Sequence, residues 1–161
     1  MITAGKARQG AVATAFQTQG MERDLRLMVY EKELGRLLFE MREHDYLIFE
    51  DSSDSDRFVQ YFVHDSAVLG EVGSRHWMPE SSVLRKTSVT ALGCLGFEGG
   101  GPQRNFSRDH LPHDARKLAC LTELLFGAAY GELVCGMTPL VRTRASREAE
   151  AEPPRQMEFD A

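Results

Sequence analysis

The sequence predicts an α+β domain in which an antiparallel β-meander packs against three helices. Residues 21–42 and 112–130 repeat large apolar side chains at three- and four-residue steps, as the buried face of a helix does. Residues 46–74 instead hold three short runs rich in aromatic and β-branched side chains, separated by polar turns. The expected order is helix, three strands, helix, short extended piece, helix.

The strands are predicted at residues 46–49, 57–64 and 67–74, joined by a polar turn over residues 50–56 and a tight turn at Asp65-Ser66. Side chains alternate across a strand, so the second strand has two different faces. One face should carry Phe58, Gln60 and Phe62, and the other Val59, Tyr61 and Val63.

A second helix is predicted to start at Pro79-Glu80, since proline is tolerated in the first turn and an acid suits the positive end of the helix dipole. It should run to Leu95, and Gly96 suits the left-handed residue that often follows a helix. Residues 98–103 are expected to be an open, glycine-rich connection, with a short extended piece around Asn105-Phe106. After the last helix, an apolar piece reaches Val141.

Length and composition predict one folded unit. The chain has 161 residues, 42% of them hydrophobic, which suits a single domain. Residues 21–141 form the expected domain, preceded by a disordered leader over residues 1–20. Residues 142–161 form a charged tail with few large hydrophobic residues, and we expect it to be disordered.

Charge and cysteine content exclude several classes of protein. The net charge of −5 argues against a nucleic-acid partner, which normally needs a basic face. No segment approaches the length of apolar chain needed to cross a bilayer, so no membrane role is expected. The three cysteines form no CxxC pair, which favours a reducing cytoplasm. Cys94 and Cys120 are predicted to be small core residues.

No motif predicts catalysis, a cofactor or a metal. The glycines at residues 99–101 follow a helix and lack the lysine and serine or threonine of a phosphate loop. His110 and His113 form an isolated HxxH pair, for which surface and capping roles are expected rather than zinc binding. Acidic residues at 51, 54 and 56 lack the glycine of a calcium loop and are interpreted as a solvated turn.

Four aromatic residues are the candidates for partner recognition: Tyr61, Phe62, Trp77 and Phe106. Their ordinary interpretation is core packing on one sheet face and half-burial on the other. The functional interpretation is a groove or a dimer face, because an open antiparallel sheet can offer a face or an edge to a partner.

The sequence ALGCLGF at residues 91–97, Asn105-Phe106 and Tyr130-Gly131, set after a leading helix and a three-strand meander, resembles the TY-Chap group. This group comprises peptide-binding, chaperone-like domains related to type III secretion chaperones and YbjN proteins. The resemblance covers about residues 21–140 and implies a compact α+β sandwich that binds a peptide or partner protein without catalysis. The chain departs from the group at Phe97 and Phe106, where tryptophan is expected, and at residues 98–101, which replace a proline-rich connection.

The leading hypothesis is therefore a cytoplasmic, chaperone-like or adaptor domain, compatible with a homodimer. Two alternatives stay open. One is a small enzyme whose site is built from His64, His76 or His110. The other is a regulatory subunit that binds a partner through its tail, which would fold on binding.

Overall fold

The helices lie on one side of a single six-stranded sheet. The computed structural model of the chain describes residues 23–40, 45–74, 84–101, 104–131 and 137–143. Its strands are β1 (Tyr46–Asp51), β2 (Asp54–His64), β3 (Ala67–Val72), β4 (Glu98–Gly101), β5 (Arg104–Leu111) and β6 (Pro139–Thr143). They pair in the order β4-β5-β3-β2-β1-β6, and every neighbouring pair is antiparallel. The predicted α+β class is confirmed.

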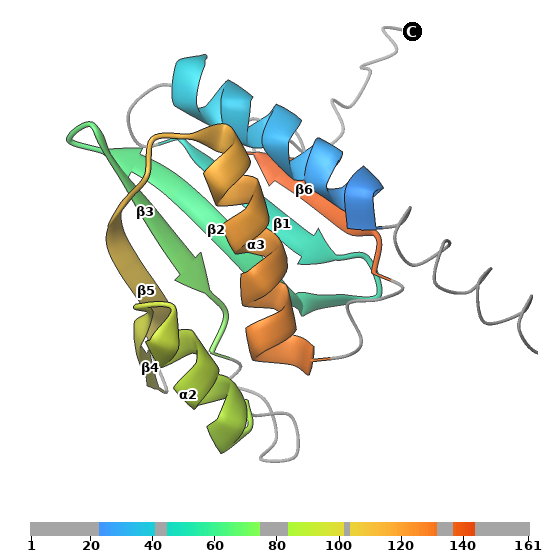
Figure 1. The fold of residues 1–161 in the computed structure, drawn as a ribbon, viewed down its shortest axis with the longest axis vertical. Helices are drawn as coiled ribbons and strands as arrows, with labels where there is room; N and C mark the ends of the chain where they lie inside the picture. Colours follow the sequence, from blue (N-terminus) through green and yellow to red (C-terminus); the bar gives the residue numbers. More distant parts are fainter. Residues whose placement is uncertain (1–22, 41–44, 75–83, 102–103, 132–136, 144–161) are drawn as a thin grey trace, which may run out of the picture.

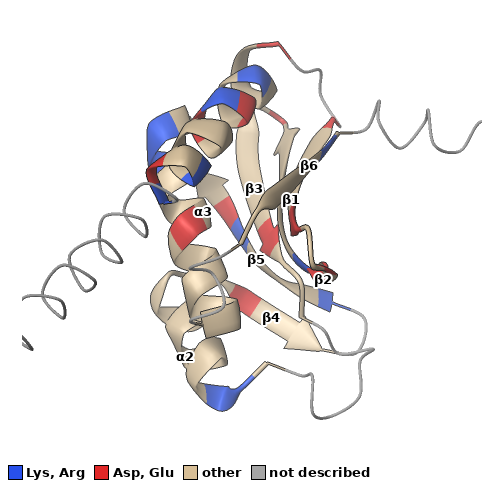
Figure 2. Cartoon of the chain, turned by 90° about the vertical axis from the view of Figure 1, so that its right-hand side faces the viewer, with Lys and Arg blue, Asp and Glu red and all other residues tan. Residues whose placement is uncertain are grey.

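Three helices cover one face of this sheet: a first helix over residues 23–39, α2 (Lys86–Cys94) and α3 (Ala115–Tyr130). Figure 1 shows this layer in front of the sheet, and Figure 2 shows the two layers edge-on. Within the described part of the chain, no helix or strand covers the opposite face. We call that opposite side the open face.

The predicted meander is confirmed as β1, β2 and β3. The turn from β1 to β2 consists of Ser52 and Ser53 and is shorter than the predicted turn over residues 50–56. The turn from β2 to β3 consists of Asp65 and Ser66, as predicted. Asp65 and Ser66 have positive φ angles of 48° and 62°. Two consecutive residues of this kind form the hairpin turn whose twist matches that of the flanking strands.

The edges of the sheet correct one expectation and add one strand that was not predicted. Residues 98–101 were predicted to be an open connection, but they form the edge strand β4, paired with β5. Gly99 and Gly100 have φ angles of 103° and 73°, and a Cβ on Gly100 would overlap the ring of Phe106. Only glycine suits this backbone and this close approach. At the other edge, the apolar piece that reaches Val141 is part of β6, which continues to Thr143 and pairs with β1.

The ends of α2 and α3 also differ from the prediction. Leu84 and Arg85 are not helical, and Arg85 has extended backbone, so α2 begins at Lys86. The predicted start at Pro79-Glu80 lies outside the described residues. Gly96 follows α2 with φ 79°, as predicted. The other helix, α3, begins at Ala115 rather than Pro112, because the Asp114 carboxylate caps it by accepting the Lys117 N–H at 2.9 Å.

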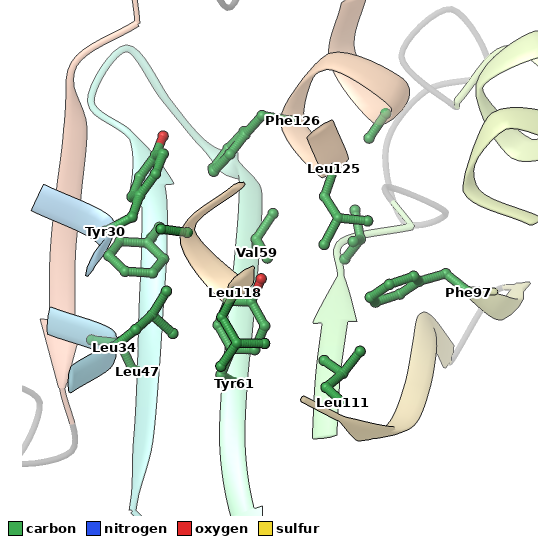
Figure 3. Packing of buried hydrophobic residues seen from close by; sticks show 14 of the residues in the cluster. Tyr30, Leu34, Leu47, Val59, Tyr61, Phe97, Leu111, Leu118, Leu125 and Phe126 are labelled. Atoms are coloured by element: carbon green, nitrogen blue, oxygen red, sulfur yellow. The ribbon is translucent and has the colours of Figure 1, made fainter. Parts of the chain in front are cut away.

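Large apolar side chains from both layers form one core (Figure 3). The first helix contributes Tyr30, Leu34 and Leu37, and the strands contribute Leu47, Phe49, Val59, Tyr61, Val68 and Val72; α3 contributes Leu118, Leu125 and Phe126. The predicted alternation along β2 is confirmed, since Val59 and Tyr61 are buried beneath the helices while Phe58, Gln60 and Phe62 are only partly buried.

The two helical cysteines are not core residues. Cys94 and Cys120 are both exposed, which contradicts the prediction from their apolar neighbours. In α3 the buried side is set by Leu118, Thr122 and Leu125, and residue 120 falls on the outer side of the helix.

Candidate functional site

The open face carries its side chains in rows that run across the strands. Directly opposed residues of antiparallel strands point to the same side of the sheet. One such row crosses the three central strands and is apolar: Tyr46 on β1 opposes Phe62 on β2, which opposes Leu69 on β3. All three side chains are half-buried. The row offers apolar surface that the described helices leave uncovered.

The neighbouring row, two residues along each strand, is mainly polar and crosses all six strands. Its members, in the order β6, β1, β2, β3, β5 and β4, are Arg142, Ile48, Gln60, Glu71, Ser107 and Glu98. We call it the polar row. Two residues of a strand rise about 7 Å, so the polar row lies about 7 Å from the apolar one.

Hydrogen bonds hold the centre of the polar row in place. The Glu71 carboxylate oxygen Oε2 accepts from Gln60 Nε2 at 2.6 Å and from Asn105 Nδ2 at 3.1 Å. The Asn105 side chain in turn accepts the backbone N–H of Ser74 at 3.4 Å. The carboxylate therefore has a defined position between β2 and β5.

Near the β6 edge of the open face, an ion pair neutralises the charge of Glu50. Arg142 Nε donates to the Glu50 carboxylate at 2.7 Å, and Glu50 is buried. A third row lies here, in which Leu140 opposes Glu50 and Glu50 opposes Phe58. Leu140 is 43% exposed, so this third row offers some accessible apolar surface beside the ion pair.

The four predicted recognition residues fall in different places. Phe62 lies on the open face, in the apolar row. Tyr61 is fully buried and its hydroxyl lies 2.8 Å from Thr122 Oγ1, while Phe106 faces the helices opposite Val72. The alternation of β2 and β5 thus makes Tyr61 and Phe106 packing residues in this structure. Trp77 lies outside the described residues.

Two of the three histidines of the predicted alternative lie within the described residues. His64 and His110 are exposed, and each lies near the carboxylate of a sequence neighbour, Asp65 at 3.3 Å and Asp109 at 3.4 Å. His76 lies outside the described residues. Within the residues that the structure describes, no three His, Cys, Asp or Glu side chains come together as a metal site.

The acidic turn is less solvated than predicted. Asp51 is buried, and its Oδ1 accepts from the backbone N–H of Ser53 at 2.9 Å and from the Ser53 hydroxyl at 2.7 Å. Arg57 lies 3.4 Å from the other oxygen. These carboxylate contacts close the β1–β2 turn, which explains an acid at this position without a ligand.

A polar cluster on the helix side joins the first helix to α3. The Arg26 guanidinium donates to both carboxylate oxygens of Glu123, and both side chains are largely buried. Tyr30 lies close to this pair, and burial, followed by the Glu123 charge, raises the pKa of its hydroxyl. These groups orient the two helices over the sheet and lie on the side away from the open face.

Fold and site together define a class: a small antiparallel sheet with helices over one face and ordered rows of apolar and polar side chains on the other. The model of the TY-Chap3 family, described as T3SS (YopN, CesT) and YbjN peptide-binding chaperone 3, matches residues 28–134. The chain belongs to this family, and the resemblance drawn from its sequence is confirmed. No curated protein and no solved structure matched the chain. None of its described helices has the length and apolar character needed to span a membrane.

Sequence reasoning missed Tyr46, Leu69 and Glu71 as members of the site. A signal for them existed, because a two-residue turn at Asp65-Ser66 sets the pairing of β2 with β3. That pairing places Phe62 opposite Leu69 and Gln60 opposite Glu71.

Proposed function

We propose that this domain is a non-catalytic, chaperone-like or adaptor module of the cytoplasm that binds a peptide or a segment of a partner protein on its open face. The observation that carries the proposal is the apolar row of Tyr46, Phe62 and Leu69, which lies half-buried on the side of the sheet opposite the helices. Membership in a family of peptide-binding chaperones supports the same function.

The physical basis is the burial of apolar surface. A partner that covers half-buried aromatic and aliphatic side chains removes their remaining surface from water, at about 25 cal/mol per Å². Large aromatic side chains in the centre of a contact commonly dominate its binding energy. Phe62 is the central member of the row, so we expect it to contribute most.

The test is selection of short random peptides displayed on phage, with the purified full chain as target. Wild type should enrich peptides, and Phe62→Ala should abolish or strongly reduce their binding. Phe39→Ala is the matched control, because Phe39 is 79% exposed on the first helix and lies outside the open face. Selected peptides that bind Phe62→Ala and wild type equally would count against the open face as the site.

A further inference from the structure

Glu71 is an oriented carboxylate that forms no ion pair with another described residue. Both donors that hold it, Gln60 Nε2 and Asn105 Nδ2, are neutral amides, and both bonds end on Oε2. No Lys, Arg or His side chain of the described residues forms an ion pair with it. The amides therefore fix the position of the carboxylate, and its negative charge has no ion-pair partner in the described part of the chain.

The other two carboxylates of the open face differ from each other in whether a described residue pairs with them. Glu50, near the β6 edge, is neutralised by Arg142 at 2.7 Å. Glu98, in the polar row on β4, is exposed and has no ion pair with a described residue. Glu71 and Glu98 flank Ser107, so two interstrand spacings, about 9–10 Å, separate their strands. The β3–β4 half of the polar row therefore carries two carboxylates that form no ion pair with a described residue, and a cationic partner would complement both.

These charges lie beside apolar surface. Glu71 and Leu69 are two residues apart on β3, and Gln60 and Phe62 are two residues apart on β2. An occupant of this region must bring a positive group within about 7 Å of a large apolar one. Side chains two residues apart in an extended peptide have that spacing, and those three or four residues apart on a helix nearly have it.

We propose that the occupant of the open face is a peptide segment in which a lysine or arginine is flanked by large apolar side chains. The apolar side chains cover Phe62 and Leu69, and the cationic group lies against Glu71, with Glu98 as a second acidic contact. The proposal rests on the proposed function and specifies the chemistry of its partner. Complementary charge of this kind sets the choice of partner and the orientation in which it binds.

The test compares the peptides that wild type, Glu71→Gln and Glu31→Gln select from the same displayed library. Glu31 is exposed on the first helix, so its variant has the same change in net charge away from the open face. Wild type and Glu31→Gln should enrich lysine or arginine next to large apolar residues, and Glu71→Gln should lose that enrichment. For one selected peptide, made with fluorescein, Glu71→Gln should weaken binding about three- to tenfold in fluorescence anisotropy. Its affinity should also depend less on salt than that of wild type.

The possible outcomes distinguish failure of the charge inference from failure of the proposed peptide-binding function. Peptides whose binding requires Phe62 but which show no excess of basic residues would overturn the charge inference and leave the proposed function in place. Equal weakening by Glu71→Gln and Glu31→Gln would also overturn it, because it would show only the effect of net charge. Selection of no peptide by wild type would overturn both.

Discussion

Replacing Tyr30 by phenylalanine is expected to stabilise the domain. The Tyr30 hydroxyl is buried and has no hydrogen-bond partner among the described residues. Its ring packs edge-on against Phe49, with centroids 4.8 Å apart, and parallel to Phe126 at 6.4 Å, and phenylalanine keeps both contacts. An unsatisfied buried polar group costs about 1–3 kcal/mol. Tyr30→Phe should therefore raise the free energy of unfolding by about 1 kcal/mol, and Tm by about 2–4 °C.

Tyr61→Phe is the matched variant with the opposite expected sign. Tyr61 is as deeply buried, but its hydroxyl lies 2.8 Å from Thr122 Oγ1, and Thr122 donates onward to the Leu118 carbonyl at 2.8 Å. Loss of this hydrogen bond should lower the free energy of unfolding by about 1 kcal/mol. Urea denaturation followed by circular dichroism measures both variants. If Tyr30→Phe loses as much stability as Tyr61→Phe, the reasoning from hydrogen-bond satisfaction is refuted.

Three further predictions concern stability. Gly70→Ala should destabilise the domain by about 1–3 kcal/mol, because the new Cβ would lie 2.7 Å from a core leucine. Gly35→Ala in the first helix has open space around it and should stabilise the domain by up to about 1 kcal/mol. Urea denaturation measures both changes in the free energy of unfolding, and equal effects would contradict the packing around Gly70. Asp114→Ala removes the cap of α3 and should cost about 1 kcal/mol in the same assay, while an unchanged midpoint would show that the cap contributes nothing. Burial raises the pKa of Tyr30 and Tyr61, so their contribution to stability is complete below about pH 10 and falls above it by about 1.4 kcal/mol per pH unit for each tyrosine. Urea denaturation at a series of alkaline pH values should show a shallower fall in Tyr61→Phe than in wild type, and identical slopes would count against the raised pKa.

Local patterns predicted the meander and the faces of its strands. In β2, alternation alone separated Tyr61 from Phe62, because a strand turns successive side chains to opposite sides. It could not show which side the helices cover. The four-residue strand β4 was missed because glycines have no side-chain periodicity, and its pairing with β5 is what identifies it as a strand. The boundaries predicted at residues 21 and 141 stay predictions.

The linear pattern was sufficient to predict the α+β class and the order of the helices and central strands, because these depend on short-range periodicity and turn chemistry. The family resemblance came instead from particular residues at 91–97, 105–106 and 130–131. Three findings required the assembled sheet: Glu71 and Glu98 share a row, Arg142 neutralises Glu50, and Tyr61 belongs to the core. Each of these depends on the pairing of distant strands or on the face that the helices cover, so the chemistry of the open face emerges only when the sheet is assembled.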